Sequence, residues 1–312
     1  MFTTEQTHSE QTKAVGPGVA GRWIAALRPK TLPAAFGPVA LGVALAAAEG
    51  AVEPLIATLC AAGALLLQIA SNLANDAFDT LKGADGPDRL GPTRAAAAGW
   101  LTPRQLLLAT ALTIAAALGV GAVLILRGGW PIALIGLSGA AAAVLYTGGP
   151  RPLGYLGLGD ALVFLYFGLC AVGGTVWVHG VEPTAATWLV ASGAGALATA
   201  ILVVNNLRDR ASDARAGKRT LAVRLGARTT RLQHSVLCGV AFAVSPLAWL
   251  LGLGDAHWML AWLAAPLGIA TTAAVWRTDG AALNPLLGRT AQLGLLWSLL
   301  LAVGIVWGGS GQ

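Results

Sequence analysis

Two polar segments of the chain share an asparagine, an aspartate four residues later, and a second aspartate soon after. The two sets are Asn72, Asp76, Asp79 and Asn205, Asp209, Asp213. On a helix, each set lies along one face. Carboxylates on one face repel each other unless a cation lies among them, and oxygen ligands without histidine or cysteine suit a hard ion such as Mg²⁺. The pattern therefore predicts a Mg²⁺ site built from two acidic segments.

Basic residues follow each acidic set, with Lys82 and Arg94 after the first and Lys218 and Arg219 after the second. Lysine and arginine bind free oxyanions, while protein-bound Mg²⁺ is commonly held by one or two carboxylates together with phosphate oxygens. The nucleotide-binding pattern GxxxxGK[ST] does not occur, so a nucleoside triphosphate is not expected. The combination predicts a diphosphate site.

The elements that must position these residues are apolar helices. Of the 312 residues, 56% are hydrophobic and 11% are charged, whereas a soluble domain carries about 25% charged residues. Stretches of about 20 residues without period-2 alternation predict an all-α, polytopic membrane protein and argue against a barrel. Nine such spans are expected, at about 31–48, 54–75, 105–126, 130–147, 160–180, 184–206, 230–253, 256–276 and 290–308.

The distribution of positive charge predicts the orientation of these spans. Nineteen of the 20 lysines and arginines fall in one set of connections, and only Arg127 falls in the other. Cytoplasmic loops are enriched in Lys and Arg, so we expect a cytoplasmic N-terminus and an outside C-terminus. Residues 1–21 lack the apolar run of a signal peptide and are expected to be a disordered tail. Residues 22–308 are expected to form one domain, with cytoplasmic acidic segments at 72–104 and 205–229.

A diphosphate site at the mouth of an apolar helical bundle implies a ligand with an apolar tail, such as a polyprenyl diphosphate. The expected surroundings are the lipid bilayer of a cell membrane, most simply the bacterial cytoplasmic membrane. No nucleic-acid partner is expected, and the oligomeric state is left open. A transporter is the alternative class, although transporters usually place polar sites near the membrane midplane, whereas both acidic sets here lie at one end.

Four stretches resemble the UbiA-type intramembrane prenyltransferases, and the likeness extends over about residues 22–308. They are LRPKTLPAAFGPV (27–39), NLANDAFDTLKGADGPDRLGPTRA (72–95), YTGGPRPLGYLGLGD (146–160) and NNLRDRASDARAGKRTLAVRLG (205–226). The chain is most similar to the branch that prenylates 1,4-dihydroxy-2-naphthoate in menaquinone synthesis. The resemblance implies nine helices around a central cavity. It also implies Mg²⁺-dependent prenyl transfer that releases diphosphate and CO₂ and gives demethylmenaquinol, with 4-hydroxybenzoate or homogentisate as alternative acceptors.

The resemblance also implies roles for individual residues. The catalytic residues are Asp76, Asp79, Asp209 and Asp213. The metal ligands are these four aspartates and Asn72. The substrate-binding residues are Asn72, Asn75, Asn205, Lys82, Arg94, Lys218, Arg219, Arg28, Tyr146 and Arg151, of which Arg28 is placed near the aromatic acceptor. Simpler interpretations remain for Arg28 as a topology charge, Tyr146 as an interfacial aromatic and Arg151 as a membrane-surface anchor. The roles of Asp85 and Asp160 stay open, the latter with a helix N-cap as one interpretation.

Overall fold

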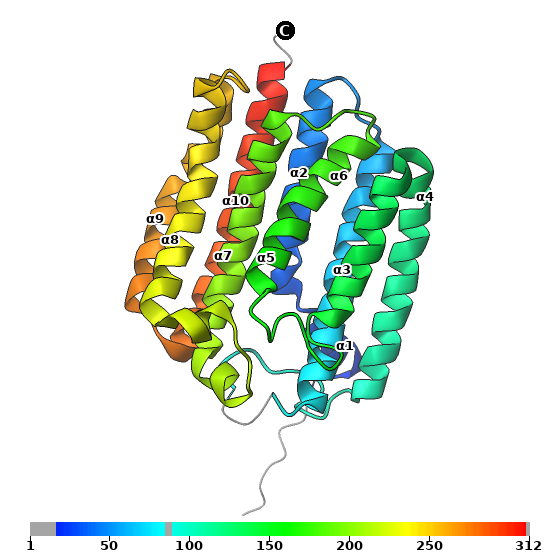
Figure 1. The fold of residues 1–312 in the computed structure, drawn as a ribbon, viewed down its shortest axis with the longest axis vertical. Coiled ribbons are helices and arrows are strands. Elements are labelled where there is room, and N and C mark those ends of the chain that lie inside the picture. The colour runs from blue at the N-terminus through cyan, green and yellow to red at the C-terminus, as the bar shows by residue number, and fades with distance from the viewer. Residues whose placement is uncertain (1–16, 85–88, 310–312) are drawn as a thin grey trace, which may run out of the picture.

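The computed structural model describes residues 17–84 and 89–309, and the regular elements within these ranges are all helical (Figure 1). The predicted all-α class is therefore confirmed for this part of the chain. Most of the predicted tail, residues 1–16, and Asp85 lie outside the described ranges. The helices are α1 (Val19–Leu27), α2 (Pro33–Ala48), α3 (Pro54–Leu81), α4 (Pro103–Leu145), α5 (Gly159–Val163), α6 (Ala171–Val178), α7 (Ala185–Arg215), α8 (Leu221–Leu250), α9 (Ala265–Arg277) and α10 (Asn284–Gly309).

The helix starts follow from local sequence. Proline occupies the first turn of α2, α3 and α4, where its missing N–H would have no partner in any case. Thr102 caps α4 through a reciprocal pair of hydrogen bonds with Gln105, which satisfies two otherwise free donors. After α3, the chain leaves the helix through Gly83, whose φ of 65° suits glycine. These signals place the acidic residues of α3 in its last turns.

Helix α4 reverses direction part-way along its length. It has 43 residues, which would span about 65 Å if straight, roughly twice the bilayer core. At Gly129 the backbone has φ 66° and ψ −153°, and Pro131 follows. The ribbon turns back there, so that both ends of α4 lie at the same end of the bundle (Figure 1). The arms before and after Gly129 therefore run antiparallel.

The number of spans differs from the predicted nine. By length and composition, residues 17–84 and 89–309 contain seven helices suited to crossing a membrane, or eight if the pair Val19–Thr31 and Pro33–Ala48, bent by 49°, forms one more. The difference arises because the predicted spans 105–126 and 130–147 both lie in α4. The predicted tail is also too long, since α1 begins at Val19. The prediction of a multi-pass membrane protein is confirmed, but the count of nine spans is not confirmed.

Helix α7 lies at the centre of the bundle. Of its apolar window, 72% is buried, against 17–39% for the other candidate spans. Close packing explains this: a Cβ added at Gly193 would approach the Trp297 ring of α10 to 2.6 Å. Small residues allow such close contact between helices in lipid. The second acidic set is therefore carried on the central helix.

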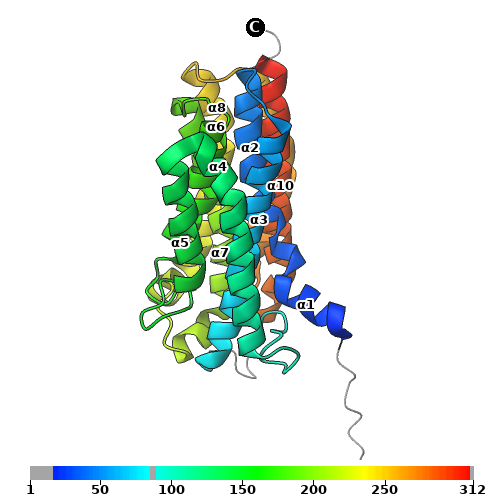
Figure 2. The ribbon, with the colours of Figure 1, turned by 90° about the vertical axis from the view of Figure 1, so that its right-hand side faces the viewer.

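The two ends of the bundle differ in character. The acidic ends of α3 and α7, the loops that follow them, and α1 lie at one end, and the end of α10 lies at the other (Figure 1). Helix α1 projects from the side of the bundle near the acidic end (Figure 2). The fold thus gathers the polar segments of the chain at one end.

Candidate active site

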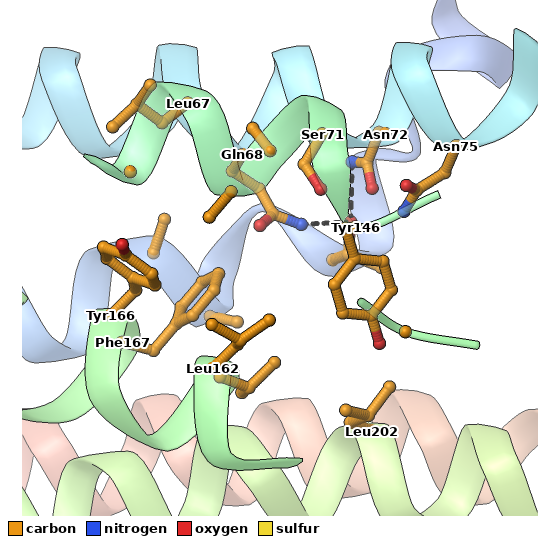
Figure 3. Close-up of a pocket in the computed structure, with 18 of the residues that line it drawn as sticks. Leu67, Gln68, Ser71, Asn72, Asn75, Tyr146, Leu162, Tyr166, Phe167 and Leu202 are labelled. Atoms are coloured by element: carbon orange, nitrogen blue, oxygen red, sulfur yellow. Dashed lines mark hydrogen bonds between the residues drawn. The ribbon is translucent and has the colours of Figure 1, made fainter. Parts of the chain in front are cut away.

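One cavity of about 590 Å³ receives the acidic ends of α3 and α7. The predicted site residues that line it from these helices are Asn72, Asn75, Asp79, Asn205, Asp209 and Asp213. The start of α2, both arms of α4, and the α5–α6 segment complete the wall. The lining changes from polar to apolar along the cavity: Asn75 and Tyr146 lie toward one side, and Leu162 and Phe167 toward the other (Figure 3). The cavity can hold a ligand with a charged head and an apolar body.

Asp79 contacts three polar side chains from other segments of the chain. Its Oδ2 lies 3.2 Å from Nη2 of Arg94, and its Oδ1 lies 3.2 Å from Nζ of Lys218. The hydroxyl of Tyr155 donates to Oδ1 at 2.9 Å. The Asp79 side chain is 3% exposed, so these are buried, charge-assisted contacts of the strong kind.

Lys218 connects the two acidic helices. Besides the contact with Asp79 of α3, its Nζ lies 3.8 Å from Oδ1 of Asp213 of α7. The ammonium group also lies 4.8 Å from the ring centroid of Tyr155. One lysine cation therefore occupies the space between carboxylates that come from distant parts of the chain.

Asp209 is held by its neighbour on α7. Nε and Nη2 of Arg208 contact the two Asp209 oxygens at 2.8 and 2.5 Å. The same guanidinium group donates to Oδ1 of Asn205 at 2.7 Å and to Oδ1 of Asn284 on α10 at 2.8 Å. Asn284 in turn donates to the carbonyl of Leu90 at 2.8 Å. The second acidic set is thereby tied to α10 and to the loop after α3.

Asp76 does not line the cavity. It is 1% exposed, and its two oxygens accept the backbone N–H groups of Ala95 and Ala96 at 3.0 and 3.2 Å. In this structure the carboxylate anchors the turn at residues 95–99 against α3. Its predicted role as a metal ligand stays a prediction.

The asparagines of α3 fix neighbouring segments to the cavity wall. Nδ2 of Asn72 donates to the carbonyl of Leu27 at 3.0 Å and to Oγ1 of Thr31 at 3.1 Å. These contacts bracket Arg28, which lines the cavity and has a positive φ of 53°. Oδ1 of Asn75 accepts from Oγ1 of Thr147 at 2.9 Å. Arg28 is thus held at the cavity by a left-handed backbone turn between α1 and α2.

The remaining predicted residues divide between the cavity and its outer side. Arg94 and Tyr146 line the cavity, and burial, reinforced by nearby carboxylates, raises the pKa of the Tyr146 phenol. Lys82 lies outside the lining, where its Nζ donates to the carbonyls of residues 147 and 149 at 2.7 and 3.0 Å. Burial lowers the pKa of Lys82. Arg151 and Arg219 are exposed and also lie outside the lining.

Asp160 is not an N-cap. Leu158 precedes α5, and Asp160 lies in the first turn without a side-chain capping bond. Its Oδ1 accepts from Nε2 of Gln233 on α8 at 2.9 Å. The carboxylate therefore joins α5 to α8 rather than closing a helix start.

A model of the UbiA prenyltransferase family matches residues 35–300 of this chain. The match covers well over half of the sequence, including both acidic sets. The chain belongs to the UbiA prenyltransferase family. The resemblance inferred from the four sequence stretches is thereby confirmed.

Similar UbiA-family proteins include the 1,4-dihydroxy-2-naphthoate octaprenyltransferase of Escherichia coli K12. It is 40% identical over 290 residues, which cover 91% of this chain and 94% of that protein. The Mycobacterium tuberculosis protein of the same name is 38% identical and covers 92% and 97% of the two chains. The UbiA prenyltransferase domain-containing protein 1 of Danio rerio is 34% identical over 70% of this chain and 66% of its own length.

Solved UbiA structures share the fold at low sequence identity. A UbiA homologue from Archaeoglobus fulgidus bound to DMAPP and Mg²⁺ gives a TM-score of 0.65 at 17% identity, over 92% of this chain and 99% of that chain. A homologue from Aeropyrum pernix K1 without ligand gives 0.64 at 17% identity, over 87% and 97%. The helical arrangement described above is therefore the UbiA fold.

The chemistry of the donors at the mouth fits a hard divalent cation. Across residues 17–84 and 89–309, no group of three or more His, Cys, Asp and Glu side chains is already arranged to hold a metal ion. Lys218 nevertheless shows that a cation is accommodated between Asp79 and Asp213. These carboxylates offer oxygen only, which suits Mg²⁺. The donor chemistry of these residues therefore fits the ion.

Two residues with direct contacts to the acidic sets were missed by sequence reasoning. Arg208 lies between Asn205 and Asp209 in the sequence and holds both. Tyr155 lies within the stretch YTGGPRPLGYLGLGD, where it is the second tyrosine. A polar aromatic residue among turn-forming glycines and prolines was an available signal, but its contact with Asp79 depends on long-range folding.

Proposed function

We propose that this protein transfers a polyprenyl chain from an allylic diphosphate to 1,4-dihydroxy-2-naphthoate, releasing diphosphate and CO₂ and giving demethylmenaquinol. The observation that carries the proposal is a cavity that runs from the charged mouth at Asp79, Asp209 and Asp213 to an apolar interior. The acceptor is supported by the relatives of that name, which are 36–40% identical over more than nine tenths of this chain.

The charged mouth suits the diphosphate of the donor. Arg94 and Lys218 line it, and their donors can turn from carboxylates to diphosphate oxygens, which are also anionic acceptors. Asp79, Asp209 and Asp213 would hold Mg²⁺, with Asn72 and Asp76 as the further predicted ligands. When bound, Mg²⁺ supplies charge neutralisation to the leaving diphosphate. The solved homologue with DMAPP and Mg²⁺ supports this pairing of donor and ion.

The apolar part of the cavity suits the prenyl chain. On α3 the lining extends from Asp79 to Cys60, a separation of 19 residues and therefore about 28 Å along the helix. Val39, Leu124 and Val178 belong to both the far lining and one buried apolar cluster. Such walls can bury the apolar prenyl tail away from water.

The acceptor fits between the charged mouth and the apolar interior. Arg28, Gln68, Ser71 and Tyr146 line the cavity, and Figure 3 shows Gln68, Ser71 and Tyr146 among its lining residues. An arginine and several hydroxyl or amide groups match a carboxylate and two phenolic hydroxyls. The dihydroxynaphthoate ring is electron-rich, so the protein's part is to position it beside C1 of the donor.

The proposal includes a topology. If α4 crosses the membrane twice and the bent pair α1–α2 contributes one span, the chain crosses nine times. Together with the positive charge near the acidic end, this count supports a cytoplasmic N-terminus and an outside C-terminus. The expected location is the bacterial cytoplasmic membrane.

The test is an assay of the purified protein in detergent or lipid vesicles, with products identified by mass. The panel pairs polyprenyl diphosphates of several lengths with 1,4-dihydroxy-2-naphthoate, 4-hydroxybenzoate and homogentisate. The expected product is decarboxylated, prenylated naphthoquinol, formed only with Mg²⁺. Preferential prenylation of 4-hydroxybenzoate or homogentisate would overturn the acceptor assignment. The absence of turnover with every pair would overturn the reaction.

A further inference from the structure

Tyr155, in the loop between α4 and α5, makes contacts with three charged side chains. Its hydroxyl donates to Oδ1 of Asp79 at 2.9 Å. The ammonium groups of Lys218 and Lys82 lie 4.8 and 5.1 Å from its ring centroid, within the range of cation–π attraction. Its backbone carbonyl accepts the N–H of Arg219 at 2.8 Å. The residue thus joins the loop after α4 to both acidic segments.

The two lysines around Tyr155 are anchored to different degrees. Lys82 is fixed by two carbonyls of the same loop. Lys218 follows Gly217, which has φ 74° and ends the turn after α7. Its flexible side chain must lose rotamer freedom when its ammonium group is held in one place. The ring of Tyr155 and the carboxylates of Asp79 and Asp213 hold it there.

We propose that Tyr155 is a positioning residue that sets Lys218 over the cavity mouth to receive the diphosphate of the prenyl donor. The ring holds the ammonium group, and the hydroxyl holds the ring against Asp79, so the lysine is already placed between the two acidic helices when the donor arrives. Lys82, which follows α3 and donates to two carbonyls of the Tyr155 loop, supports the ring as a second cation. This inference rests on the proposed function, because it concerns the same donor.

Two substitutions separate the parts of this role. Tyr155→Phe keeps the ring and removes the bond to Asp79, while Tyr155→Leu removes both. A cation–π contact contributes about 0.5–2 kcal/mol, so we expect Tyr155→Leu to raise the KM for the prenyl diphosphate roughly 2- to 30-fold. Tyr155→Phe should raise it less, about 2- to 4-fold, because the ring stays and only the hydrogen bond to Asp79 is lost. The KM for the naphthoate should change less than twofold in both.

The decisive measurement is a double-mutant cycle with Lys218→Ala. If Tyr155 acts through Lys218, then Tyr155→Leu adds less than a twofold rise in donor KM once Lys218 is alanine. Arg224→Leu is the matched control, because Nη2 of Arg224 donates to the carbonyl of Leu156 in the same loop at 2.8 Å without touching the acidic residues. This control should leave the donor KM within twofold. Gel filtration and thermal unfolding in detergent establish that each variant is folded.

Several outcomes would overturn the inference. One is an equal KM rise for donor and acceptor in Tyr155→Leu, and another is a full Tyr155→Leu effect in the Lys218→Ala background. A rise in the donor KM of Arg224→Leu as large as that of Tyr155→Leu would also overturn the inference, because it would show only that the loop must be folded. Calorimetry of inorganic diphosphate binding in the presence of Mg²⁺ distinguishes failure of the Tyr155 inference from failure of the proposed reaction. An inactive wild-type protein would reject the reaction, while a Tyr155-dependent diphosphate affinity would still support the inference.

Discussion

Asp79 accepts simultaneously from Arg94, Tyr155 and Lys218 in a buried mouth. Replacing it with asparagine keeps the shape of the side chain and removes its charge. Loss of a comparable preorganised electrostatic group lowers kcat by about 10²- to 10³-fold, and we expect Asp79→Asn to fall in this range. Steady-state kinetics with each substrate varied in turn checks it.

The matched control for Asp79→Asn is Asp279→Asn. Asp279 pairs with Arg231 at 2.6 Å, but its side chain is 81% exposed. Exposed ion pairs contribute about 0–1 kcal/mol, so this variant should keep nearly normal kcat. Near-normal kcat in Asp79→Asn as well would remove Asp79 from the catalytic machinery.

Asp76 differs from Asp79 in what its oxygens already do. Both accept buried backbone N–H groups of the turn at residues 95–99. An asparagine retains only one accepting oxygen, so Asp76→Asn leaves a buried N–H without a partner, at a cost of about 1–3 kcal/mol. We expect a lower midpoint of thermal unfolding, measured in EDTA so that metal binding plays no part. An unchanged midpoint combined with weaker Mg²⁺ binding would instead favour the metal-ligand role.

At this scale, sequence spacing was informative about some residues and silent about others. The spacing in α3 and α7 predicted one helix face for each acidic set, and Asp79, Asp209 and Asp213 line the cavity, whereas Asp76 does not. The spacing could not indicate that the turn at residues 95–99 covers Asp76. Nor could it bring Tyr155 to Asp79, because that contact joins residues 76 positions apart. Contacts of this kind depend on how the loops fold back over the helix ends.

At the scale of elements, hydropathy predicted the helices well because each must satisfy its backbone within lipid. It placed the break between two predicted spans at residues 127–129, close to the reversal of α4 at Gly129. Hydropathy could not show that a single non-helical residue, Gly129, separates the two arms. It also missed α1, since nine residues ending before a proline-containing turn are too short to cross a membrane.

Gly129 permits the reversal of α4, and its substitution tests this. Its φ of 66° and ψ of −153° lie in a region that is essentially restricted to glycine, so Gly129→Ala should destabilise the protein by about 1–3 kcal/mol. Gly119→Ala is the control: this exposed glycine lies in the first arm of the same helix and has no atom within 4 Å of an added Cβ. It should leave the unfolding temperature unchanged or raise it. Equal midpoints for the two variants would show that Gly129 is not required for the reversal.

At the scale of the whole molecule, the acidic end and the end of α10 lie on opposite sides of the bundle (Figure 1). The nine-span proposal predicts that a reporter fused after Gln312 reads as extracytoplasmic. A reporter fused after Thr278, between α9 and α10, should read as cytoplasmic. Alkaline phosphatase and green fluorescent protein fusions, which are active on opposite sides, provide the measurement. A cytoplasmic signal after Gln312 would require an even number of crossings.

The buried pairing of Asp79 with Arg94 and Lys218, both of which line the cavity, has a consequence for the joint binding of donor and metal. These charges have already lost their hydration on folding, so an incoming diphosphate that takes the cations leaves carboxylates without counter-ions in a dry site. If Mg²⁺ binds there as proposed, it would restore neutrality, and each ligand would strengthen the binding of the other. By thermodynamic linkage, the factor by which Mg²⁺ raises donor affinity equals the factor by which the donor raises Mg²⁺ affinity. The internal ion pairs would thus couple the binding of donor and metal, so that each binds more tightly when the other is present.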